Sequence, residues 1–217
     1  MRGYAASALS SQFRDAAAFD AFYAALSDDQ KDEFLRVGSS YLFLVKQGDW
    51  HVDVEDSNPV INYFTNSFKL VSLFSLIESL SPEKHQDFYE WLGHVGEGIY
   101  PIAGKGALKQ LHDRYKATFG SIRRCVAFFE RLSSRQKADL CSSIQIDGTP
   151  VKSVMDVAQF LYNLRSKFVH EGEFVLDIAN VPVMSRHKKA NTLTALSMPK
   201  LLEAFEEGVV AYFNHAT

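Results

Sequence analysis

An arginine and a histidine stand five residues apart in the stretch Phe160–Gly172 (FLYNLRSKFVHEG), and both side chains suit phosphate chemistry. Arg165 keeps its positive charge at any workable pH, and its planar guanidinium presents a fork of donors that matches phosphate oxygens. His170 has an ordinary pKa of about 6.5, so it can accept and return a proton near neutrality. The pair therefore predicts a site that binds a phosphate group and moves a proton beside it.

An amphipathic helix must position these two side chains, and the residues before them have its spacing. The expected buried stripe consists of Val157, Leu161, Leu164 and Phe168. Gly172 then supplies a natural helix stop. Five residues at about 100° each leave about 140° between Arg165 and His170, so an ideal helix puts them on different faces. Either the helix frays or tightens before His170, or the two groups meet across a subunit interface.

The run Arg165–His170 (RSKFVH) resembles the R-x4-6-H signature of the HEPN superfamily, and the wider run LYNLRSKFVHEG is most similar to its ApeA-type branch. The resemblance implies an all-helical bundle that is usually dimeric. Many members are metal-independent ribonucleases whose paired motifs face each other. Others have no known catalysis and bind RNA, nucleotides or partner proteins. This sequence has Ser166 where the commonest ribonuclease form has Asn or Asp, which favours the binding class.

Four further residues are expected to contribute to the site. Asn163 and Ser166 are polar neighbours that can orient the histidine or contact a phosphate, and Lys167 adds positive charge. Glu78 ends a long apolar segment whose Leu-Ile-Glu ending resembles the first bundle helix of ApeA-type proteins, and the resemblance implies that Glu78 approaches Arg165. For each of the four, an ordinary solvated or surface position is the competing interpretation.

Three functions remain open from the sequence. The first is a metal-independent endoribonuclease with a defence or toxin-type role, in which Arg165 and His170 are catalytic. The second is a non-catalytic HEPN protein that binds RNA, a nucleotide or a protein partner. The third is a helical interaction domain in which the arginine and histidine occur together by coincidence. The first two predict a homodimer formed through the motif helix.

Composition limits the class of protein. Hydrophobic residues make up 47% and charged residues 23% of the 217 residues, as in an ordinary soluble globular protein. The net charge of -3 means that any RNA site must be a local basic patch. Basic residues occur at Arg123/Arg124, Arg131, Arg135/Lys137 and residues 186–189. They either line a groove that follows an RNA backbone or are scattered surface charges. Cys125 and Cys141 lack metal or disulfide spacing, which fits a reducing cytosol, so a cytoplasmic location is expected.

No cofactor or metal is expected, because the histidines stand apart and no zinc-binding motif occurs. No run of residues approaches 18 apolar positions, so no membrane span is expected. The amino-terminal residues lack the continuous apolar segment of a signal peptide.

The predicted fold is all-α, a HEPN-like helical bundle with an N-terminal helical extension. Residues 1–57 are expected to form a helical pair followed by an extended arm around Trp50, and residues 58–217 the bundle. Ser27 and Ser133 each follow a leucine and are expected to cap a new helix. Asp147–Gly148 predicts a turn. Residues 174–178 alternate weakly, as in a strand or an extended cover, and residues 184–192 are expected to form a polar loop.

Overall fold

Most of the chain is helical in the computed structural model, which describes residues 1–49, 55, 58–80, 86–94, 102, 104–187 and 190–215. The amino-terminal part contains α1 (Arg2–Ala8), the 3-10 helix η1 (Ser10–Gln12), α2 (Ala16–Ala25), α3 (Asp28–Tyr41) and the π-helix η2 (Leu42–Lys46). The remaining helices are α4 (Asn58–Ser79), α5 (Phe88–His94), α6 (Lys105–Phe119), α7 (Ser121–Phe129), α8 (Ser134–Ser142), α9 (Val154–Glu171) and α10 (Met198–His215).

A small antiparallel sheet accompanies the helices, so the all-α prediction holds only in the coarser sense that the chain is mostly helical. The strands are β1 (Ile144–Ile146), β2 (Thr149–Pro150), β3 (Val183–His187) and β4 (Ala190–Thr194), in the order β2-β1-β4-β3. Residues 184–192 thus belong mainly to a hairpin, and their prediction as a polar loop is wrong. Thr192 and Thr194 are buried in this hairpin, and threonine is a residue that favours strands. The sequence did not reveal the strand because a count of apolar residues leaves threonine out.

Local capping explains where several helices begin. Ser27 accepts a hydrogen bond from the Gln30 amide and forms a capping box for α3, and Ser133 accepts one from the Gln136 amide at the start of α8. Both predicted caps are therefore confirmed. The predicted turn is also present, since Asp147 and Gly148 have φ values of 48° and 78° in the β1–β2 hairpin.

The core is one continuous cluster of buried apolar side chains between α3, α4, α7, α9 and α10. It includes Phe34 and Tyr41 of α3 as well as Phe205 and Phe213 of α10, so the amino-terminal helices share it with the later ones. The domain boundary expected near residue 57 stays a prediction, because most of the extended segment predicted around Trp50 lies outside the described residues. Residues 174–178 form no strand; the Leu176 amide donates to the Phe174 carbonyl at 3.0 Å in a tight turn, and Val175 and Ile178 are buried.

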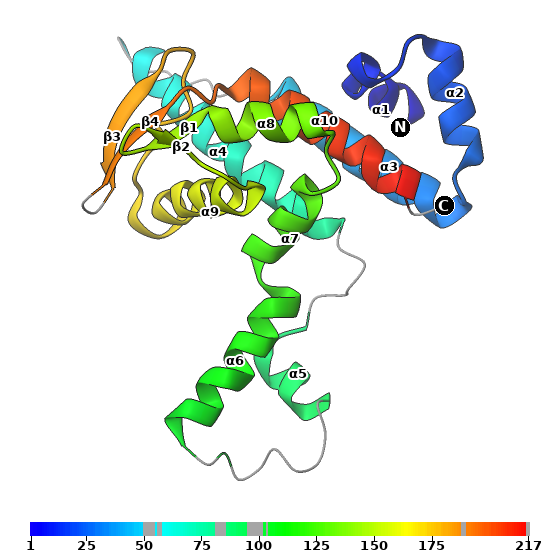
Figure 1. Ribbon diagram of the computed structural model, residues 1–217. Coiled ribbons are helices and arrows are strands. Elements are labelled where there is room, and N and C mark those ends of the chain that lie inside the picture. Colours follow the sequence, from blue (N-terminus) through cyan, green and yellow to red (C-terminus); the bar gives the residue numbers. More distant parts are fainter. Residues whose placement is uncertain are drawn as a thin grey trace.

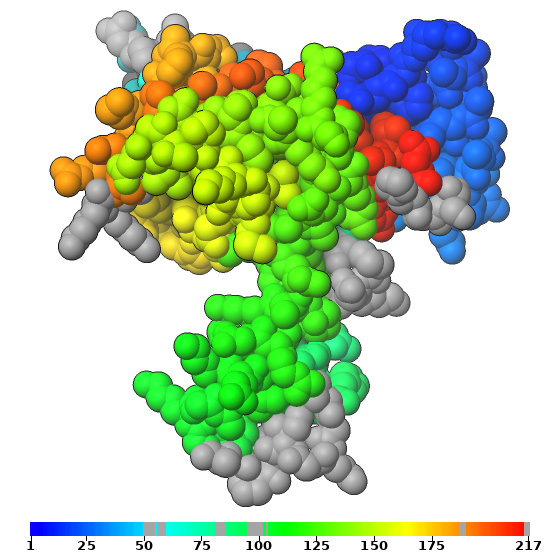
Figure 2. All heavy atoms as spheres, viewed as in Figure 1, coloured from blue at the N-terminus to red at the C-terminus, as the bar shows by residue number. Residues whose placement is uncertain are grey.

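An arm extends from this body. In Figures 1 and 2, α5 and α6 project away from the other helices, and α6 leads through Gly120 into α7. Phe88 and Trp91 of α5 stack on each other and pack against Tyr115 of α6, with ring centroids 5.5 to 6.1 Å apart. The arm therefore has a small aromatic core of its own.

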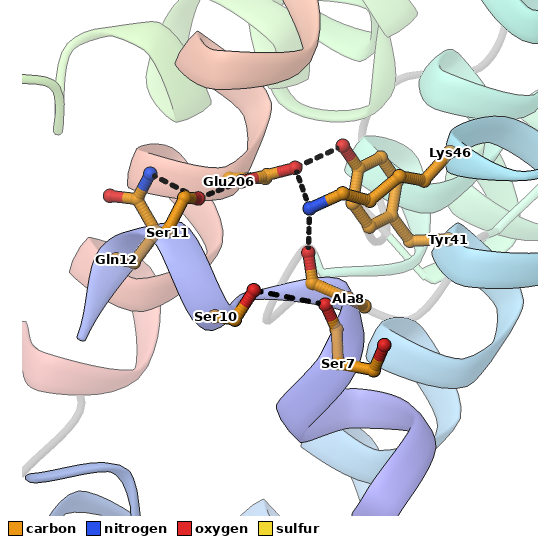
Figure 3. Close-up of polar contacts among 8 residues, drawn as sticks. All are labelled: Ser7, Ala8, Ser10, Ser11, Gln12, Tyr41, Lys46 and Glu206. Carbon is orange, nitrogen blue, oxygen red and sulfur yellow. Dashed lines mark hydrogen bonds and ion pairs between the residues drawn. The ribbon is translucent and has the colours of Figure 1, made fainter. Parts of the chain in front are cut away.

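A buried ion pair ties the two ends of the chain together (Figure 3). The Glu206 side chain on α10 is 6% exposed and lies 2.9 Å from the Lys46 ammonium. The Tyr41 hydroxyl donates to Glu206 at 2.6 Å, and the Ser11 hydroxyl donates to its other oxygen. Lys46 also donates to the Ala8 carbonyl at 2.6 Å. Because both carboxylate oxygens have donors, this buried charge is compensated and has a structural role.

Helix α4 also has an unusual composition. Its segment Val60–Ser79 is the one helix in the described part of the chain that is long and apolar enough to cross a membrane by length and composition. The core helix of a soluble protein meets the same criterion, and α4 contributes Leu70, Leu73 and Phe74 to the buried cluster. The expectation of no membrane span stays a prediction.

Candidate functional site

Helix α9 positions the predicted site, and its ends follow from the local sequence. Ser153 accepts a hydrogen bond from the Asp156 amide, and the Asp156 side chain accepts one from the Ser153 amide at 3.2 Å. This is the reciprocal capping box. Gly172 ends the helix in the left-handed conformation, with φ of 72°, where glycine has no steric cost. Each end is therefore set by side chains close to it in sequence.

The helix remains regular through the motif, which settles how the two principal residues are arranged in one chain. The Gly172 amide donates to the Phe168 carbonyl at 3.1 Å, as an unbroken α-helix requires. Arg165 and His170 thus keep the separation of about 140° expected for five helical residues. Arg165 is half-buried on the side of α9 that packs into the core, whereas His170 is exposed. A single chain does not bring the two groups together.

The outer face of α9 collects the polar residues of the motif. Asn163, Ser166 and His170 lie within about 60° of one another around the helix axis. Gln159 joins them, and its side-chain amide donates to the Asn163 carbonyl oxygen at 3.0 Å. This face presents two amides, a hydroxyl and an imidazole to solvent, a set of donors and acceptors that suits a ribose or phosphate.

Lys167 lies at the edge of this polar face, about 40° from Asn163 around the helix axis. Its ammonium lies 2.7 Å from the Glu173 carboxylate, which follows the helix end. The hydrogen bond to Glu173 raises the pKa of Lys167, and the charge of the same carboxylate adds to the effect. Since this exposed positive charge already has a partner, Lys167 contributes less to phosphate binding than its sequence position suggests.

Arg165 has part of its hydrogen-bonding capacity unused. Its Nε atom is buried and has no hydrogen-bond partner in the part of the chain that the structure describes. The residues on either side pack against α4, with Phe168 5.1 Å from Phe68 and Tyr162 6.3 Å from Phe74 between ring centroids. A buried guanidinium nitrogen without a partner is costly, so a ligand or a second protein chain that supplies an acceptor there would be stabilised.

Glu78 does not pair with Arg165, contrary to what the resemblance implies. Among the described residues neither side chain forms an ion pair, and the Glu78 Oε1 atom is buried without a hydrogen-bond partner. Glu78 instead lies near α7: its backbone carbonyl accepts from Arg124 at 3.3 Å. Burial, and then the charge of Glu78, raise the pKa of the Cys125 thiol. The end of α4 therefore lies beside α7.

The structure also brings together residues that the sequence showed only as scattered charge. Arg123, Arg124 and Arg131 line one pocket of about 280 Å³. The sequence gives no spacing signal for this set, because Arg124 lies on α7 and Arg131 lies in the turn after its end. By contrast Arg135 and Lys137 pair with the acidic residues Asp139 and Glu130. Arg186 lies on β3, and residues 188–189 are outside the described part.

Comparison with known proteins adds no relative. No protein family, no curated protein and no solved structure matches the chain. Nor do the described residues contain a group of three or more His, Cys, Asp or Glu side chains that could hold a metal ion. The geometry of α9 and α7 is therefore the guide to function.

Proposed function

We propose that the protein is a metal-independent, HEPN-type endoribonuclease that is active as a homodimer, with Arg165 of one copy and His170 of a second copy acting on the same RNA phosphodiester. The single observation that carries the proposal is the surface of α9 between these two residues. Val169 lies there, about 40° from Arg165 around the helix axis, and Met155 lies on the same side of α9 near its start. They are 47% and 60% exposed. Apolar side chains exposed between the two groups favour the docking of a second copy.

The chemistry follows from the two side chains. His170 removes the proton from a ribose 2′-hydroxyl, and the resulting oxygen attacks the adjacent phosphorus. The bond to the 5′-oxygen breaks, leaving a 2′,3′-cyclic phosphate on one product and a 5′-hydroxyl, protonated from water or imidazolium, on the other. Arg165 neutralises charge that develops on the phosphate oxygens. A positioned base contributes about 10²- to 10⁴-fold to such a reaction.

The test is RNA cleavage in EDTA with analysis of the product ends. We expect the wild type to produce cyclic phosphates and to leave DNA intact, because DNA lacks the 2′-hydroxyl. His170→Ala and Arg165→Ala should each lower the rate by about 10²-fold or more. Lys152→Ala is the matched control, because Lys152 is exposed, lies just before α9 and does not belong to the predicted site. Full activity in both motif variants would disprove the proposal.

Mixing the two inactive variants tests whether the site is shared. In a mixed dimer, Arg165 of one copy and His170 of the other are both intact in one of the two sites, so part of the activity should return. If both residues act within one chain, mixing restores nothing. This experiment separates the proposed arrangement from a site that forms by a rearrangement of α9.

A second candidate, non-catalytic binding of RNA, is favoured by the placement of Arg165 on the packed side of α9. The polar outer face formed by Asn163, Ser166 and His170 can contact RNA without Arg165 taking part in catalysis. Under this alternative, the folded protein binds RNA in a salt-dependent way but leaves diverse RNAs uncut, and Asn163→Ala weakens binding.

A further inference from the structure

A pocket at the base of the arm is lined by arginines and apolar side chains. It lies where the end of α4, α6, α7 and α10 meet, and its volume is about 280 Å³, close to the lower limit of about 300 Å³ for small-molecule sites. Leu80 and Phe128 form part of its apolar wall, and Tyr212 of α10 contributes an aromatic ring. Figure 1 shows α7 between the arm and the body. The lining residues come from both sides of it, so the pocket lies at the junction of the two.

Three positive charges converge on this pocket without a paired acid. Arg123, Arg124 and Arg131 line it, and none of the lining residues is acidic. Within the described part of the chain, these three guanidinium groups form no ion pair. Uncompensated like charges in one pocket repel one another, so an anion bound between them would relieve the repulsion.

Arg124 is the arginine of this pocket whose buried donor atoms have no acceptor among the described residues. Its Nε and Nη2 atoms are buried and have no hydrogen-bond partner in the described part of the chain, while Nη1 donates to the Glu78 backbone carbonyl at 3.3 Å. Nε and one terminal nitrogen of a guanidinium form the edge that binds two oxygens of one phosphate or carboxylate. This edge is therefore held in place by a bond at the opposite nitrogen, and no acceptor of the described residues faces it.

Arg131 and Tyr212 form the other side. The Arg131 guanidinium lies 5.1 Å from the centre of the Tyr212 ring and donates to the Ala127 carbonyl at 2.8 Å. These contacts hold a cation and an aromatic face at fixed positions beside the apolar wall. A ligand with a phosphate at one end and a flat ring at the other would contact both kinds of group.

We propose that this pocket binds a nucleoside monophosphate, with its phosphate on Arg123 and Arg124 and its base against Tyr212 and the apolar wall. Arginine is the side chain suited to bidentate phosphate recognition. The pocket is of the order of size that one nucleotide needs, and a longer ligand would have to extend out of it. The assignment is independent of the Arg165/His170 activity, because it uses residues of α7 and α10.

The test is calorimetric titration of the full chain with adenosine monophosphate, with adenosine as the ligand that lacks the phosphate. We expect adenosine monophosphate to bind and adenosine to bind at least about tenfold more weakly, since charge-assisted hydrogen bonds are lost. Arg123→Gln and Arg124→Lys should each weaken nucleotide binding about tenfold. Arg135→Gln removes the same charge from an exposed position outside the pocket and should leave binding unchanged.

Two outcomes would overturn the proposal. One is that the folded wild type binds neither adenosine monophosphate nor inorganic phosphate at millimolar concentration. The other is that Arg123→Gln, an exposed position whose change spares the core, binds as tightly as the wild type. An oligoribonucleotide with a 5′-phosphate, compared with its 5′-hydroxyl form, identifies the source of the phosphate. Preference for the phosphorylated RNA over the free nucleotide would assign the pocket to RNA ends.

Discussion

Glu206 carries a charge inside the protein, and the side chains around it show how single residues hold the fold. Its carboxylate receives hydrogen bonds from Tyr41 and Ser11 and lies 2.9 Å from the Lys46 ammonium (Figure 3). Removal of one member of such a group leaves the others without partners, which costs more than the intact pair contributes. The intact group therefore holds the amino-terminal helices against α10.

Glu206→Ala should lower the free energy of unfolding by about 3 kcal/mol, because Tyr41 and Lys46 lose their acceptor. Lys46 has a side chain that is 30% exposed and keeps some contact with water, which holds the cost toward the low end of the range for buried pairs. Urea denaturation of the two proteins measures the difference. Glu203→Ala on the exposed side of the same helix is the control, and equal losses in the two variants would contradict the structural role.

The free energy of unfolding should fall in alkaline solution through Tyr41. Burial raises the pKa of its hydroxyl far above the ordinary value of 10.0, and the hydrogen bond to Glu206 adds to the rise. Above about pH 10 the unfolded chain releases this proton while the folded protein keeps it. The unfolded state then binds fewer protons, so the free energy of unfolding decreases as pH rises.

Tyr41→Phe should therefore remove part of this pH dependence. At pH 7 the variant is less stable than the wild type, but the difference narrows above about pH 10 by up to about 1.4 kcal/mol for each pH unit. Denaturation curves at several alkaline pH values give the two slopes. Tyr89→Phe serves for comparison, because Tyr89 is 81% exposed. Parallel pH profiles for wild type and Tyr41→Phe would be the contrary result.

At the scale of elements, α7 and α10 approach closely because Gly208 leaves room for a ring. A Cβ atom at position 208 would lie 2.5 Å from two carbon atoms of the Phe128 ring. Phe128 also packs on Phe205, with ring centroids 5.6 Å apart. Helices α7 and α10 contribute side chains both to the core and to the pocket lined by Arg123 and Arg124. The distance between the two helices therefore affects both the stability of the protein and the shape of the pocket.

Gly208→Ala should lower the free energy of unfolding by about 1 to 3 kcal/mol, because the added methyl group forces α7 and α10 apart. A double-mutant cycle with Phe128→Leu tests the cause. If the clash with the ring is responsible, the cost of the alanine should shrink in the Phe128→Leu background. An unchanged cost in that background would show that the destabilisation arises elsewhere.

At the scale of the whole molecule, the body and arm in Figure 2 leave the motif helix at the surface. The proposed site shared by Arg165 and His170 can form only if a second copy of the protein covers α9. We expect that contact at Val169, which lies between Arg165 and His170, and at Met155 on the same side of α9 nearer its start. Dimerisation and the proposed ribonuclease activity should therefore be lost together.

Val169→Glu should shift the protein from dimer to monomer and reduce RNA cleavage in parallel, because the new charge would be buried at the interface. Sedimentation equilibrium measures the dissociation constant, which should rise at least about tenfold. Tyr89→Glu places the same charge on the exposed side of the arm and should leave the dimer intact. A wild-type protein that is monomeric at all accessible concentrations would contradict the proposed shared site.

The sequence by itself determined the features that depend on neighbours along the chain. Ser27, Ser133 and Ser153 cap helices, and Asp147–Gly148 forms a turn, because each of these structures closes within a few residues. The buried stripe of α9 and its end at Gly172 follow for the same reason. Spacing also implied that Arg165 and His170 lie on different faces if the helix stays regular, but only the structure shows that it does.

Only the tertiary structure decided which distant residues meet. β1 pairs with β4, whose residues are almost fifty positions further along the chain, and this pairing turned an expected polar loop into part of a sheet. Tyr41 and Glu206, separated by 165 positions, share a buried hydrogen bond. Such contacts depend on how the whole chain buries its apolar surface, which local spacing does not encode. For the same reason the arginines of α7 become a pocket only when α4, α6 and α10 close around them.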